Sequence, residues 1–247
     1  MAKNRKKRIG SMDDTRNPLD YFIAGVPALG YFELQADKLA ELVSSSKEAK
    51  LAGLNLVAEV SLIGLAAYFE AFCKAHFASL INICPEILRN FLERRRNATV
   101  SLSHILTVRG ELGFKLGNVI SEEYDFGSAK EINGLYQDLL RITPFSTKDA
   151  KKYSQFLSDR NLVHHGGVFT YTYSSQRFAN RANPGLPHFH SLIIGKKEFH
   201  HWKSFVVAMA VKIATTAQSA MEGFFARENL SPTPEQMRAI RSLGSSR

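Results

Sequence analysis

Arg160, Asn161, His164 and His165 are the residues whose types and spacing best suit catalysis. They lie in the segment Asp-Arg-Asn-Leu-Val-His-His-Gly-Gly, residues 159–167. A free imidazole has a pKa of about 6.5, so it takes up and releases protons at neutral pH. A guanidinium stays charged and binds a phosphate through two hydrogen bonds. Together they can activate an RNA 2′-hydroxyl and stabilise a pentavalent phosphorane without a metal ion.

The spacing of these residues decides which groups can meet. Arg160 and His164 are four residues apart, so they share one face of a helix. His165 lies about 140° round the helix from Arg160. These two groups therefore converge only if the last turn unwinds or if a second protomer presents the same segment. Asn161 can bind the phosphate or orient a neighbouring side chain.

The Arg–His spacing resembles a known family. Arg160, four intervening residues and His165, at the end of a helix in an all-α chain, resemble the motif of the HEPN superfamily, in which four to six residues separate Arg from His. The run Ala-Ala-Tyr-Phe-Glu-Ala-Phe, residues 66–72, is similar to the first core helix of that family. The resemblance covers residues 35–227 in architecture and is strongest to standalone bacterial members found beside toxin and phage-defence genes.

The resemblance implies a metal-independent endoribonuclease that forms a homodimer, so that two motifs make one cleft. It assigns the scissile phosphate to Arg160, acid/base catalysis to His165 and the polar position after the arginine to Asn161. Glu70 matches an acidic position on the core helix and is expected to pair with Arg160. An antitoxin or another defence-system protein is a candidate partner. Some toxins of this family carry a tyrosine, modified by a partner enzyme, where this chain has Gly167, so that route of regulation is not implied.

Other interpretations of the same residues remain open. His164 is the alternative acid/base group, because two adjacent histidines leave open which of them corresponds to the histidine of the motif. Cations at the C-terminal end of a helix also stabilise its dipole, which gives Arg160 and His165 a purely structural explanation. At the level of the whole protein, the rivals are a non-catalytic HEPN module that binds RNA or a protein, and a structural protein that oligomerises.

Further candidate ligand residues lie outside this segment. Single-stranded RNA can be held by charge and stacking, and the RNA-binding candidates are Lys74, Arg177 and Arg181, with Phe178 between the two arginines. His188, His190, His200 and His201 invite a metal site, but no cysteine or carboxylate cluster completes a shell. We therefore expect no metal and no cofactor.

Hydropathy periodicity predicts the elements that must position these residues. The predicted helices cover residues 31–43, 50–83, 86–95, 101–108, 111–122, 128–142, 147–163 and 198–228. Two β-prone runs, 168–173 and 189–194, predict a small β-hairpin before the last long helix. The predicted fold class is therefore an all-α, HEPN-like helical bundle with a β-hairpin insertion.

Length, charge and cysteine content bound the class of protein. The 247 residues suggest a flexible basic tail and lead-in at 1–30, a helical domain at 31–228 and a polar tail at 229–247 with one helical turn around Glu235 to Leu243. Removing the five cations of residues 3–8 from the net charge of +9 leaves +4, a modestly basic body that favours a polyanion such as RNA. The 2 cysteines imply no disulfide framework and favour a reducing cytoplasm. Charged residues interrupt the longest apolar run, so no membrane span is expected.

Overall fold

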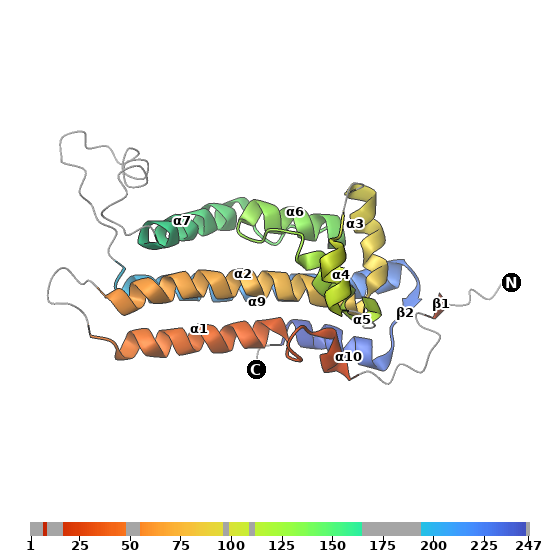
Figure 1. The fold of residues 1–247 in the computed structure, drawn as a ribbon, viewed down its shortest axis with the longest axis horizontal. Helices are drawn as coiled ribbons and strands as arrows, with labels where there is room; N and C mark the ends of the chain where they lie inside the picture. The colour runs from red at the N-terminus through yellow and green to blue at the C-terminus, as the bar shows by residue number, and fades with distance from the viewer. Residues whose placement is uncertain are drawn as a thin grey trace. The chain divides into compact units, whose positions relative to one another are not determined.

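The fold is all-α, as predicted. The computed structural model describes residues 7–8, 17–47, 55–95, 99–108, 112–164 and 194–245, and 79% of this part is helical (Figure 1). The two β-prone runs of the predicted hairpin lie outside the described residues, except for Ile194. The hairpin therefore stays a prediction.

The chain divides into two compact units. Unit 1 comprises Met1–Glu33, Glu70–Ser146 and Ala208–Arg247, and unit 2 comprises Leu34–Phe69 and Thr147–Val207. The helical domain predicted for residues 31–228 thus contributes to both units.

Four long helices carry the residues of unit 2: α1 (Ala28–Ser45), α2 (Leu56–Ile83), α7 (Thr147–His164) and α9 (Lys196–Arg227). Of these, α1, α2 and α9 also contribute residues to unit 1. In α2 the side chains of Leu62, Leu65 and Phe69 are fully buried.

Helix α2 begins later than its predicted start at Lys50. Asn55 accepts a hydrogen bond from the Ala58 amide at 3.0 Å and donates one to Ser46 Oγ at 2.8 Å. A side-chain acceptor at this position satisfies an amide that has no partner within the helix, so asparagine favours a helix start. Hydropathy periodicity alone did not reveal this cap.

The shorter elements belong to unit 1. They are β1 (Lys7–Arg8), η1 (Pro18–Tyr21), η2 (Pro85–Ile87), α3 (Leu88–Arg94), α4 (Leu102–Val108), α5 (Leu112–Ser121), α6 (Ala129–Leu140), β2 (Leu230–Ser231) and α10 (Pro234–Leu243). Pro85 opens the element after α2, as predicted. The two-residue strands β1 and β2 pair in parallel.

The core of unit 1 is aromatic. The ring of Phe77 meets those of Phe91, Phe126 and Tyr136 at centroid distances of 6.0, 5.6 and 5.9 Å. A histidine is buried among these rings: His76 stacks on Tyr136, and its Nδ1 lies 2.8 Å from the Tyr136 hydroxyl.

Burial lowers the pKa of His76 to about 3, so its imidazole is neutral in the folded protein. No described residue hydrogen-bonds its buried Nε2.

The helical turn predicted around Glu235 to Leu243 is the helix α10 of 10 residues, and it is packed rather than part of a polar tail. Thr233 and Gln236 form a capping box, and Pro234 occupies the first turn. Gln236 Nε2 also donates to the Ile83 carbonyl at 2.8 Å, which satisfies a carbonyl at the end of α2. Ala239, Ile240 and Leu243 are buried on the same face.

Residues 17–30 likewise differ from the expected flexible lead-in. Asn17 caps η1, and Tyr21, Phe22 and Leu29 are almost fully buried. Elements η1 and α10 contact each other (Figure 1). The two ends of the described chain therefore help to complete the core of unit 1.

Two helices are long and apolar enough to cross a membrane by length and composition alone. These are α2 and α9, with mean hydropathies of 1.7 and 1.2 over the most apolar stretch. Within those stretches, 44% and 39% of the residues are buried inside the protein. Core helices of soluble proteins pass the same test, so this is weak evidence, compatible with a soluble protein and with membrane association.

Candidate functional site

The predicted catalytic segment forms the C-terminal end of α7 in unit 2. Arg160 and Asn161 are partly buried, and His164 is exposed in the last turn. His165, assigned to acid/base catalysis, lies outside the described residues, as do Arg177 and Arg181. The described part of the segment therefore consists of the phosphate-binding candidate, its polar neighbour and the alternative histidine.

A buried polar contact holds this end of α7. Asp159, only 4% exposed, accepts a hydrogen bond from the Trp202 indole Nε1 of α9 at 3.1 Å. The Trp202 ring also packs on Phe156, at a centroid distance of 5.6 Å. Phe156 contacts Tyr153, which contacts Phe69 of α2. The residue immediately before Arg160 is thus fixed by two helices of the same unit.

Arg160 has a buried nitrogen that the described protein does not satisfy. Its Nε is inaccessible to solvent, and no hydrogen bond to it is found among the described residues. No ion pair of its guanidinium with a described residue is found either. A buried donor without a partner is costly, more so on a charged group, and each such group calls for an explanation.

His164 and Arg160 share a face of α7, since the helix runs unbroken from Thr147 to His164. His164 is exposed. Of the two adjacent histidines, it is therefore the one whose placement beside the arginine is described.

The histidines considered for a metal divide between the described residues and the rest. His188 and His190 lie outside the described residues. His200 Nε2 is 3.2 Å from the Ser44 hydroxyl, and the His201 ring packs against Trp202 at 5.2 Å. Among the described residues, no group of three or more histidine, cysteine or acidic side chains is placed to hold a metal ion.

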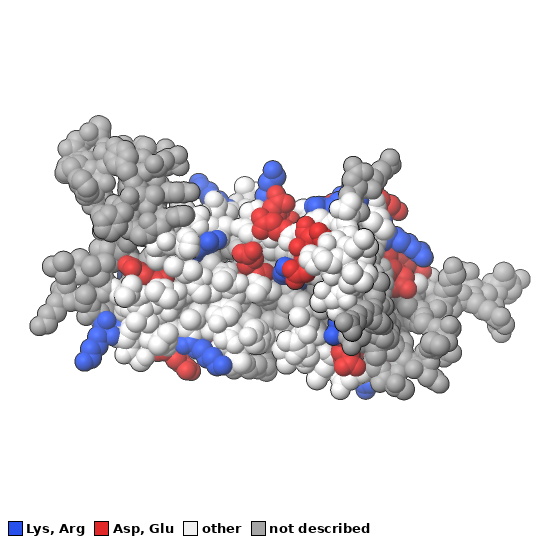
Figure 2. Space-filling view, viewed as in Figure 1, with Lys and Arg blue, Asp and Glu red and all other residues white. Residues whose placement is uncertain are grey.

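Glu70 and Lys74, the two candidates on α2, belong to unit 1. Lys74 forms an ion pair with Glu122 at 2.5 Å, so part of its charge is already countered within that unit. The predicted pairing of Glu70 with Arg160 and the RNA contact of Lys74 stay predictions. On the face in Figure 2, the described Lys and Arg side chains are scattered among Asp and Glu and form no continuous basic patch.

Sequence reasoning missed the contact between Asp159 and Trp202. Two signals for it exist in the sequence. Asp159 falls in a series of buried residues spaced by three, with Tyr153, Phe156 and Leu162. A buried indole N–H also requires an acceptor. Neither signal identifies the partner, because 43 residues separate the two side chains.

Removing the Asp159 carboxylate is expected to destabilise the end of α7. Asp159→Ala leaves the buried Trp202 N–H without its acceptor, which typically costs about 1–3 kcal/mol. Asp159→Asn retains an acceptor oxygen and should cost less. Urea unfolding of both variants measures the difference. Equal stability of Asp159→Ala and the wild type would show that this hydrogen bond does not hold the helix end.

Comparison with known proteins identifies no relative. The chain matches no protein-family model, and no curated protein or solved structure is significantly similar to it.

Proposed function

We propose that the protein is a metal-independent endoribonuclease of the HEPN type that cleaves single-stranded RNA at the C-terminal end of α7. The observation that carries the proposal is the buried, unsatisfied Nε of Arg160, next to a helix position that the hydrogen bond between Asp159 and Trp202 fixes. A guanidinium held in this way is already partly desolvated, so its interaction with a phosphate is stronger than in water.

The reaction follows from the chemistry of RNA. A histidine takes the proton of the 2′-hydroxyl, whose oxygen then attacks the adjacent phosphorus. The bond from phosphorus to the 5′-oxygen breaks, and that oxygen receives a proton from a general acid. The products are a 2′,3′-cyclic phosphate and a 5′-hydroxyl. Arg160 stabilises the charge that develops on the phosphoryl oxygens, and Asn161 hydrogen-bonds the phosphate or orients the arginine.

Either histidine of the pair can supply the acid/base group. The resemblance assigns the role to His165, and the shared helix face with Arg160 favours His164. In a homodimer with a composite cleft, the two copies of the segment provide both an acid and a base. A toxin or phage-defence effector that a partner protein neutralises would have this activity. A reducing cytoplasm suits such a protein, because both cysteines, Cys73 and Cys84, are buried and form no disulfide.

The direct test is to incubate the full chain with single-stranded RNA in EDTA and to analyse the ends of the products. Cyclic phosphate and 5′-hydroxyl ends are expected. RNA with 2′-deoxy substitutions should remain intact because it lacks the nucleophile. Cleavage that requires a divalent ion, or products with 5′-phosphate ends, would contradict the mechanism. RNA binding without any product would identify the protein as the non-catalytic module instead.

A further inference from the structure

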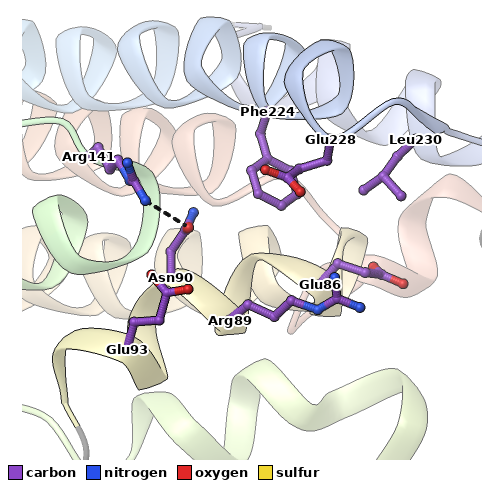
Figure 3. Close-up of a pocket in the computed structure, with 8 residues that line it drawn as sticks. All are labelled: Glu86, Arg89, Asn90, Glu93, Arg141, Phe224, Glu228 and Leu230. Carbon is purple, nitrogen blue, oxygen red and sulfur yellow. Dashed lines mark hydrogen bonds between the residues drawn. The ribbon is translucent and has the colours of Figure 1, made fainter.

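A charged pocket lies within unit 1, separate in sequence from the Arg160 segment. Its volume is about 460 Å³, within the range typical of small-molecule sites. The lining residues are Glu86, Arg89, Asn90, Glu93, Arg141, Phe224, Glu228 and Leu230 (Figure 3).

The pocket is built by the consecutive helices η2 and α3, by the C-terminal ends of α6 and α9, and by the strand β2. Glu86, Arg89, Asn90 and Glu93 recur at spacings of three and four along η2 and α3, so they form one helical face. Phe224 lies in the last turn of α9 and Glu228 directly follows that helix, on the other side of the pocket in Figure 3, and Leu230 belongs to β2. Phe224 is 4% exposed, so its ring forms an apolar floor.

The charged side chains of this pocket are not neutralised by one another. Five of the eight lining residues are charged, with both signs present, yet no ion pair of any of them with a described residue is found. The polar contacts found are a long hydrogen bond from Arg141 to Asn90 Oδ1 at 3.5 Å and one from the Cys84 thiol to Glu86 at 3.4 Å. Two guanidiniums and three carboxylates are thus available to a ligand.

Arg141 occupies an unusual position for an arginine. It ends α6 in the left-handed conformation, with φ of 61° and ψ of 33°. Glycine or asparagine is usual there, because this conformation costs other residues about 1–2 kcal/mol. The Arg141 side chain points toward Asn90 in the pocket (Figure 3). We read an arginine at this costly position as a sign that its guanidinium serves the pocket.

We propose that this pocket binds a zwitterionic ligand of amino-acid size with an apolar side chain. The guanidiniums of Arg89 and Arg141 suit a carboxylate, which they can bind through paired hydrogen bonds. The carboxylates of Glu86, Glu93 and Glu228 suit an ammonium group. Phe224 and Leu230 contact the apolar side chain. The proposal is independent of RNA cleavage.

The test uses three probes that share the phenylalanine side chain and differ in net charge: the zwitterion L-phenylalanine, its anionic N-acetyl derivative and its cationic amide. The full chain is titrated with each probe while chemical shifts are followed by NMR. The zwitterion should give saturable shifts and bind at least about tenfold tighter than either singly charged analogue, since each lost charge pair removes a charge-assisted hydrogen bond. Equal binding of all three probes, tighter binding of the amide, or no saturation with any probe would overturn the proposal.

Variants then locate the site. Arg89→Gln and Glu228→Gln should each weaken phenylalanine binding about tenfold. Arg141→Gly should weaken it as well, with Tm unchanged or raised because glycine tolerates the left-handed backbone. Arg94→Gln on α3 and Glu222→Gln on α9 are matched controls outside the pocket and should bind as the wild type does. Unchanged binding in all three pocket variants would show that the ligand binds elsewhere and would overturn the assignment.

Discussion

Replacing Arg160 by alanine is expected to lower kcat/KM for RNA cleavage by about 10²–10³, the loss typical when one donor to a developing anion is removed. The fold should survive, because no described residue forms a hydrogen bond or ion pair with this guanidinium. The variant also removes a buried donor that lacks a partner, which offsets part of the lost packing. Tm should therefore change little while activity collapses, the pattern expected of a residue kept for function at some cost in stability.

A lysine variant and a control variant distinguish a specific phosphate contact from a general effect of positive charge. Arg160→Lys retains the positive charge but loses the planar fork that binds a phosphate through two hydrogen bonds, so most of the activity should still be lost. Lys151→Ala removes an exposed cation from the same helix and serves as the matched control. Loss of activity in Lys151→Ala equal to that in Arg160→Ala would indicate a general effect of charge rather than a specific phosphate contact.

Single alanine variants of the adjacent histidines decide which one transfers protons. Loss of cleavage in His165→Ala alone would match the HEPN resemblance. Loss in His164→Ala alone would match the helix face shared with Arg160. Full activity in Arg160→Ala and in both histidine variants would contradict the proposed site.

Acid should destabilise the protein through His76. Its imidazole has a pKa of about 3 in the folded state and about 6.5 when unfolded. Between these values the unfolded chain binds one more proton than the folded one, so the free energy of unfolding falls as the pH falls. The decrease is about 1.4 kcal/mol for each pH unit in this window. Above pH 7 or so, the imidazole is neutral in both states and contributes no slope.

A double-mutant cycle isolates this effect. His76→Phe leaves the buried Tyr136 hydroxyl without its partner, and Tyr136→Phe leaves His76 Nδ1 without its own. Each single variant should lose about 1–3 kcal/mol near neutral pH. The double variant replaces both polar partners by apolar rings of similar shape, so it should recover most of that loss or exceed the wild type.

The measurement is urea unfolding of the wild type and the double variant at several pH values between about 4 and 8. The difference in stability between them should widen steadily below about pH 6.5 in favour of the double variant. Other titrating groups, such as Glu123 with its lowered pKa, are common to both proteins and cancel in the difference. Parallel pH profiles would mean that His76 is not buried in the neutral form.

The helices themselves could be predicted from the sequence because helix formation depends on local spacing and on end signals. Pro85 marks the start of η2, and Ser128 accepts a hydrogen bond from the Glu131 amide where α6 begins. The predicted helix through Arg160 and Val163 is α7. These signals act within one or two turns, so a single sequence displays them.

Other features could not be predicted because they depend on residues far apart in the chain. The amphipathic spacing of α10 is visible in the sequence, but its burial in unit 1 is not, since Gln236 satisfies the carbonyl of Ile83, 153 residues away. The pairing of His76 with Tyr136 spans 60 residues. No periodicity or cap signal encodes such a contact.

In the candidate site, too, local features could be predicted from the sequence and long-range contacts could not. The sequence by itself determined that an arginine, an asparagine and histidines stand at the end of a helix, because their types and spacing are local. Only the tertiary structure decided that Asp159 is anchored to Trp202 and that the Arg160 Nε is buried without a described partner. The physical reason is that burial and hydrogen-bond satisfaction depend on which helices pack together, and distant parts of the chain set that packing.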